Sequence, residues 1–217
     1  MPVSLSDARR ADSRDRPPGP VPPRTRLWLD FVNTDAAAQS PGGDLLRDFE
    51  ALLSWFQAQG AVDDERAAGI RRRAVLQPAA AAATLVDARR VRAALRVLAE
   101  KGHLSDRVRD DAVLEINRVL GRSAGTRRLD ARAEGGYARA FVPTGDAFAG
   151  LMIPIVESAA DSLVEAELAR ARRCADPRCH RVFLDGTKNG RRRWCDMGTC
   201  GNRAKAARHR ARTVPRP

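Results

Sequence analysis

The sequence predicts a mainly α protein with an N-terminal helical domain, which contains a small β-hairpin, and a C-terminal treble-clef-like zinc finger made of a β-hairpin and a helix. Three observations predict this fold class. Apolar residues recur at helical spacing in successive segments between Asp44 and Leu168. All four cysteines lie in two C-x4-C pairs near the C-terminus. Most of the net positive charge lies in that same segment.

The charge distribution separates the chain into two unequal parts. From Arg172 onward lie 14 of the 39 Arg and Lys residues but only three of the 27 Asp and Glu residues. This segment therefore carries +11 of the formal net charge of +12, and the preceding residues are close to neutral. A polyanionic partner is expected to bind the C-terminal segment.

The location of the protein is predicted from two missing signals. No uninterrupted apolar stretch reaches the roughly 20 residues that a membrane helix needs. The N-terminus lacks the apolar core of a secretory signal. We therefore expect a cytoplasmic protein, which would be nucleoid-associated if it binds DNA.

Composition predicts four regions. Residues 1–24 mix charges with a Pro/Gly cluster and are expected to form a disordered leader. The helical domain follows at 25–170, with a role in sensing or dimerisation, then the zinc finger at 171–212 and a basic tail at 213–217. The first buried element is expected within Arg26–Thr34, where alternating apolar residues fit a short strand or an extended entry into a helical core.

Caps and breakers set the bounds of the next helices. Asp44, Asp63 and Ser105 are candidate N-caps, and Gly60 and Gly102 are candidate helix ends. The predicted helices are 44–60, 63–77, 79–102 and 105–121, with Pro78 closing the second or opening the third. Their apolar stripes contain Leu45, Phe49, Leu52, Leu53 and Phe56 in the first, Leu85, Val91, Leu95 and Leu98 in the third, and Val108, Ala112, Ile116 and Val119 in the fourth.

A hairpin and a long helix are predicted to complete this domain. Two short runs in 126–142 flank Glu134-Gly135-Gly136 and predict a β-hairpin. A helix beginning at Thr144 or Asp146 is expected to reach the first cysteine, with a kink or break near 150–153 because Pro154 lies inside it. Its apolar residues are Phe148, Leu151, Ile155, Leu163 and Leu168.

The cysteine spacing predicts one structural Zn²⁺ ion. Two close pairs can each bind one side of a tetrahedral ion, and the insert between them lets the chain return. The predicted ligands are Cys174, Cys179, Cys195 and Cys200. His180 could replace its neighbour as a ligand, although four cysteines suffice without it. Two disulfides are the alternative for a secreted chain.

The residues between the cysteine pairs predict the finger's local structure. Val182 and Leu184 oppose Phe183, and Asp185-Gly186 and Asn189-Gly190 are turn signals, so a hairpin is expected over 181–194. Cys200 precedes a run of helix formers and should lie at a helix N-terminus. Phe183 and Trp194 are expected to form the finger's small core, with base stacking by Trp194 as the alternative.

The C-terminal sequence resembles a known family. The run RRWC-x4-CGNR-x-K, preceded by C-x4-C and an FLD turn, resembles the CGNR zinc finger, and the LDFVNT stretch at 29–34 resembles the start of its usual partner, the ABATE domain. The motif residues in place besides the cysteines are Phe183, Asp185, Arg193, Trp194, Gly201, Asn202, Arg203 and Lys205. The resemblance implies a stress-induced transcription regulator whose finger binds DNA.

The basic residues of the finger are the candidate nucleic-acid contacts. They spread around the predicted C-terminal helix, which favours contact with phosphates and leaves one or two to reach base edges. A solvated charge run or a protein-docking surface is the alternative, and RNA is the alternative partner. The candidates are Lys188, Arg191, Arg192, Arg193, Asn202, Arg203, Lys205, Arg208, Arg210 and Arg212.

A few polar residues of the helical domain could form a ligand pocket. Asp30, Asn33 and Thr34 either cap and turn the chain or line a site, and one arginine of Arg89, Arg90 and Arg92 could be buried against Asp30 or an anionic effector. No catalytic triad and no phosphate-binding glycine loop are present, so no enzymatic activity is predicted. A ligand-binding protein or an enzyme with a purely structural finger remains the alternative to a regulator, and a homodimer is expected.

Overall fold

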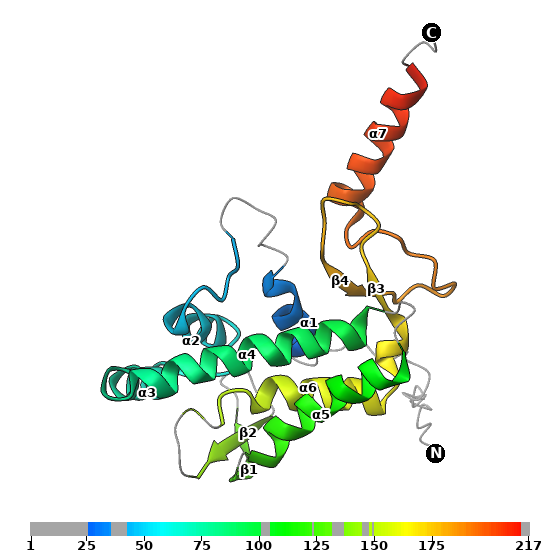
Figure 1. Cartoon of the computed structure of the whole chain (residues 1–217). Coiled ribbons are helices and arrows are strands. Elements are labelled where there is room, and N and C mark those ends of the chain that lie inside the picture. Colours follow the sequence, from blue (N-terminus) through cyan, green and yellow to red (C-terminus); the bar gives the residue numbers. More distant parts are fainter. Residues whose placement is uncertain are drawn as a thin grey trace, which may run out of the picture.

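The computed structural model describes residues 26–35, 43–100, 105–122, 124–131, 137–144, 148 and 150–213. Helices form most of the N-terminal domain, and the finger lies on one side of it, with its last helix projecting away (Figure 1). The predicted leader, the Glu134-Gly135-Gly136 turn and residues 214–217 of the tail lie outside the described residues. The elements are α1 (Leu27–Val32), α2 (Phe49–Ala58), α3 (Asp64–Leu76), α4 (Pro78–Ala99), α5 (Asp106–Arg122), β1 (Gly125–Ala131), β2 (Tyr137–Pro143), α6 (Ile153–Val164), the 3-10 turn η4 (Glu167–Arg170), β3 (Ala171–Arg173), β4 (Val182–Leu184), the π-helical turn η5 (Met197–Gly201) and α7 (Asn202–Thr213).

The first buried element is a helix, so the expectation of a strand or an extended entry was wrong. Trp28, Phe31 and Val32 of α1 are fully buried. Their spacing of i, i+3 and i+4 is helical, but every second residue is apolar as well, so the two periods overlap in so short a segment. The Trp28 indole N–H donates to Ser162 Oγ at 2.9 Å, which fixes α1 against α6.

The second helix begins later than predicted. Its N-cap is Asp48, whose carboxylate accepts a hydrogen bond from the Ala51 N–H, whereas Asp44 accepts from the Leu46 N–H in a turn before the helix. Leu45 is consequently 53% exposed. Gly60 follows the helix with a φ of +63°, the left-handed conformation that glycine adopts without strain.

Helices α3, α4 and α5 follow the predicted caps closely. Asp63 caps α3 through the Arg66 N–H, and Pro78 occupies the first turn of α4, where its missing N–H costs nothing. Ser105 immediately precedes α5. The predicted stripe of α4 is buried or partly buried, whereas Gly102 lies outside the described residues.

The last part of the helical domain differs from the predicted long helix. β1 and β2 form the expected antiparallel hairpin, with Gly125 opposite Pro143. Helix α6 begins only at Ile153, because Pro154 is tolerated in a first turn and not inside a helix. It ends at Val164, and the left-handed Ala166 (φ 56°) leads into η4 and β3. A short strand, and not a rigid helix, therefore leads to the first cysteine.

The core lies where α1, α2, α4 and α6 converge. Its largest fully buried side chains include Trp28, Phe31, Phe56, Leu95 and Ile155. Figure 1 shows α4 running across the molecule between α1 and α5. In the described part of the chain, no helix combines the length and the apolar character that crossing a membrane requires.

Candidate zinc centre and basic helix

The four cysteines converge on one point. Their Sγ atoms all lie within 4.8 Å of one another, and the Cys179–Cys195 and Cys195–Cys200 pairs are 3.7 Å apart. Tetrahedral Zn–S bonds of about 2.3 Å place sulfur atoms roughly 3.8 Å apart. All four residues are free thiols, with Cys174 and Cys200 buried. The cluster therefore fits a single structural zinc ion, and four thiolates leave no open position for a reacting water.

The first cysteine pair lies on a tight turn that Asp176 organises. The Cys179 N–H donates to the Asp176 carbonyl at 2.8 Å, and the Arg178 N–H donates to the buried Asp176 carboxylate. This backbone N–H has the largest effect in lowering the pKa of the Asp176 carboxyl below its usual value, and Arg203 contributes further. The turn is thus stabilised around an ionised carboxylate.

Arg203 connects this turn to the last ligand. Its Nε donates to Asp176 Oδ2 at 2.7 Å, and its Nη2 donates to Cys200 Sγ at 3.0 Å. One guanidinium therefore neutralises a buried carboxylate and contacts a zinc-binding sulfur at the same time. Contacts of this kind orient metal ligands and stabilise the charged thiolate.

The finger's hairpin pairs differently from the prediction. β4 pairs with β3, which precedes Cys174, so that Ala171 lies opposite Leu184 and Arg173 opposite Val182. No strand forms at 191–194, and the expected hairpin over 181–194 is wrong. The cause is Asp185, whose carboxylate accepts from the Thr187 N–H and hydroxyl and from the Arg192 N–H, closing a loop in place of a tight turn.

The two faces of β4 belong to two different cores. Val182 and Leu184 pack with the core of the helical domain, as does Ala171 of β3. Phe183 points the other way and packs with Cys174 and Cys200, and Trp194 covers this cluster. The predicted finger core of Phe183 and Trp194 is confirmed. The core of the helical domain thus extends into the finger through β3 and β4.

Polar contacts strengthen the same junction. The Asn33 amide pairs with the backbone of Val182, accepting from its N–H at 2.8 Å and donating to its carbonyl at 2.9 Å. The Arg96 guanidinium donates to the His180 carbonyl at 2.9 Å and to the Val32 carbonyl at 3.0 Å, and it pairs with Asp35 and Glu100. Arg96 was not singled out from the sequence, because it resembles the other arginines of a helix whose exposed face is basic.

The helix that follows the last cysteine begins with a close turn. The Asp196 carboxylate caps η5 by accepting from the Thr199 N–H at 2.7 Å. Gly201 lies so close to Met197 that an added Cβ would meet its sulfur at 2.8 Å. The Asn202 amide donates to the Gly198 carbonyl. Cys200 consequently lies in η5, separated from α7 only by Gly201 and therefore near the predicted helix N-terminus.

The predicted nucleic-acid contacts fall into two groups. Arg192 and Arg203 bind within the finger: Arg192 donates to the carbonyls of Trp194 and Cys195 and stacks over the Phe183 ring at 4.9 Å. Arg193 lies over the Trp194 ring at 5.2 Å but is exposed. The side chain of Arg212 lies outside the described residues. Exposed cations remain at Lys188, Arg191, Arg193, Lys205, Arg208 and Arg210.

The histidines that the structure describes take no part in the thiol cluster. His180 Nδ1 lies 3.1 Å from Arg173 Nη2, and the group of metal-ligand atoms that the described residues bring together contains only the cysteines. His103 lies outside the described residues.

The structure brings together two of the predicted ligand-pocket residues, Thr34 and Arg92, and places Asn33 against β4. Thr34 Oγ1 accepts from Arg92, which also binds Asp44 in a part-buried ion pair, whereas Asn33 holds Val182. One arginine of the set, Arg92, is buried, which the sequence allowed, and its carboxylate partner is Asp44 instead of Asp30. Asp30 itself is exposed, but partial burial of its carboxyl group raises the pKa of that group, and Arg181 partly opposes this effect.

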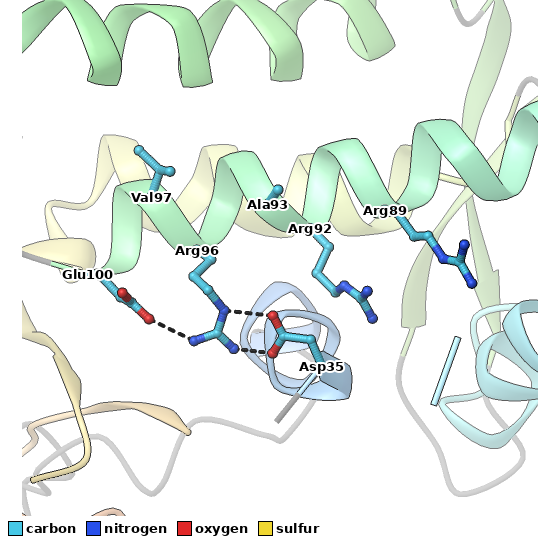
Figure 2. A pocket seen from close by; sticks show the side chains of 7 residues that line it. All are labelled: Asp35, Arg89, Arg92, Ala93, Arg96, Val97 and Glu100. Atoms are coloured by element: carbon cyan, nitrogen blue, oxygen red, sulfur yellow. Dashed lines mark hydrogen bonds and ion pairs between the residues drawn. The ribbon is translucent and has the colours of Figure 1, made fainter. Parts of the chain in front are cut away.

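A neighbouring depression of about 400 Å³ lies along α4. Figure 2 shows Arg89, Arg92 and Arg96 projecting from the same side of this helix, with Asp35 held by Arg96. Of the predicted pocket residues only Arg92 lines it. Arg89 donates to the Leu46 and Arg47 carbonyls. The guanidiniums of this depression are thus bound by groups of the protein itself.

Two family profiles match the chain. The CGNR zinc finger matches residues 170–213. The ABATE profile, described as "putative stress-induced transcription regulator", matches residues 25–166, more than half of the chain. No curated protein matches.

Proposed function

Because the chain belongs to the ABATE family and carries the CGNR zinc finger, we propose that it is a DNA-binding transcription regulator whose finger contacts DNA. The observation that carries the proposal is α7, which begins two residues after Cys200 and bears only basic charges. A zinc site fixes the base of this helix, and its exposed cations suit phosphate neutralisation. The four-thiolate centre supports a non-enzymatic role.

The test is a titration of zinc-loaded full-length protein with duplex from its own promoter region, followed by fluorescence anisotropy. Affinity should fall steeply with salt, by a slope of about 0.9 for each neutralised phosphate in a log–log plot. Chelation of zinc, or Cys195→Ser, should abolish binding. An absence of binding at low salt would contradict the proposal.

The same titration with structured RNA distinguishes the alternative partner. A basic surface by itself attracts either polymer, so the competition between duplex DNA and structured RNA decides between them. Tighter binding to RNA at matched length and salt would replace the DNA proposal with RNA association.

The helical domain is proposed to sense a signal or to dimerise, because one finger offers little surface for specific recognition. Dimerisation would present two fingers to two half-sites. Sedimentation velocity of the full chain at micromolar concentration should show a dimer. A monomer at these concentrations would contradict dimerisation, and sensing would then be the one proposed role of this domain.

A further inference from the structure

The placement of α7 distinguishes it from a basic patch on a flat surface. It packs against its own preceding turn η5, and Figure 1 shows it projecting away from the helical domain. Its twelve residues span about 18 Å at 1.5 Å per residue. A projecting helix of this length can enter a groove, whereas a surface patch can only lie across one.

The side chains of α7 are arranged in two basic flanks. At about 100° per residue, Lys205 and Arg208 lie on one side of the helix and Arg203 and Arg210 on the other. Arg203 is partly engaged with Asp176 and Cys200, so Arg210 is the free cation of its flank. On one side, the residues between the flanks are all small: Ala207 and Ala211, which are exposed, and Ala204, which is partly buried at the base of the helix.

We infer that α7 enters the major groove of duplex DNA, with its two basic flanks against the two phosphate backbones and Ala207 toward the base edges. This inference rests on the proposed function and specifies how the finger engages DNA. The B-form major groove is about 12 Å wide and admits a helix of about 10–12 Å diameter. Small side chains on the leading edge let the helix approach the floor, and cations on both sides reach both strands.

The geometry also selects against double-stranded RNA. The major groove of an A-form helix is deep and narrow, so side chains and helices do not enter it readily. Cations on opposite sides of one projecting helix can then neutralise only one backbone at a time. The partner of α7 is therefore B-form DNA.

Two substitutions of alanine by leucine test the insertion without changing the charge of the helix. Ala207→Leu adds bulk to the leading edge, whereas Ala206→Leu adds the same bulk on the other side of the helix, where His209 also lies. Both positions are exposed and both substitutions retain a good helix former. We expect Ala207→Leu to weaken binding at least tenfold and Ala206→Leu to change it less than twofold, with zinc content and circular dichroism unchanged in both.

Modified duplexes test which groove is used. DNA in which 5-hydroxymethylcytosine is glucosylated carries sugar in the major groove, and netropsin occupies the minor groove. The wild-type protein should lose at least tenfold in affinity for the glucosylated duplex and should tolerate netropsin. Equal affinity for glucosylated and plain DNA, or equal effects of the two leucine variants, would overturn major-groove insertion while leaving DNA binding intact. Failure of the wild type to bind plain duplex would refute the proposed function itself.

Discussion

Single residues stabilise this fold where buried charges meet. The Arg92 guanidinium is almost completely buried and binds Asp44, while also donating to the Thr34 hydroxyl. The pKa of the Asp44 carboxyl lies below its usual value, mainly because of the hydrogen bond from Arg92. Removing one partner of such a pair leaves the other buried charge without compensation, which costs more than the net value of the pair.

Asp44→Asn should therefore lower the free energy of unfolding by about 1–3 kcal/mol at pH 7, measured by urea denaturation. Because the folded pKa lies below the unfolded value of about 3.9, the ionised carboxylate stabilises the protein fully above about pH 5 and progressively less as pH falls through the folded pKa. The difference between variant and wild type should accordingly shrink on acidification. A pH-independent difference would show that shape, and not charge, is responsible. Glu165→Gln, at an exposed position, is the control.

Arg203 links the first cysteine turn to the last zinc ligand. Arg203→Gln removes the cation that joins Asp176 to Cys200 Sγ. Zinc affinity should fall about 10–100-fold, as expected for groups that orient metal ligands, and competition with a chromophoric chelator measures it. Arg210→Gln removes the same charge from the same helix without contacting the ligands and should leave zinc affinity unchanged. Equal zinc affinities in all three proteins would contradict the assigned contact.

Among the elements, β4 has the most unusual position, because its three residues serve two cores. Leu184→Ala should lower the free energy of unfolding of the helical domain by about 2–4 kcal/mol, although Leu184 lies among the finger residues in the sequence. Urea denaturation monitored by far-ultraviolet circular dichroism, which reports mainly on the helices, would measure the loss. Zinc content should remain stoichiometric. Loss of zinc without loss of helical stability would assign Leu184 to the finger alone.

The elements also show what the sequence could predict. Caps such as Asp63 and the periodic stripe of α4 are local signals, and they placed these helices correctly. The spacing of the cysteines within each pair is also a local signal, and it predicted the thiol cluster. The partner of β4 was not predictable, because three residues carry little pattern and β3 lies beyond the cysteine turn. Asn33 and Arg96 act through contacts across the junction, which no local pattern reveals.

At the scale of the whole molecule, a near-neutral helical domain holds a basic finger in a fixed position. The junction combines the apolar contacts of Ala171, Val182 and Leu184 with the polar contacts of Asn33 and Arg96. Elements that share a core tend to unfold together. A signal that changes the helical domain can therefore reach the finger through packed residues, without passing along a linker.

Zinc removal tests this coupling. Chelation releases the thiols that position β3 and β4. The resulting loss of ordered structure should extend into the helices that contact these two strands. Hydrogen exchange of the full chain should become faster after chelation in peptides covering 27–35 and 92–100, which contain Asn33 and Arg96, as well as in the finger. Peptides from α3 and from the β1–β2 hairpin serve as internal controls, because the main contacts of β4 are with α1, β3 and η4. Cys195→Ser should reproduce the pattern without a chelator. Faster exchange confined to residues after Arg173 would instead show that the finger unfolds independently, because a shared core requires both sides of the junction to respond.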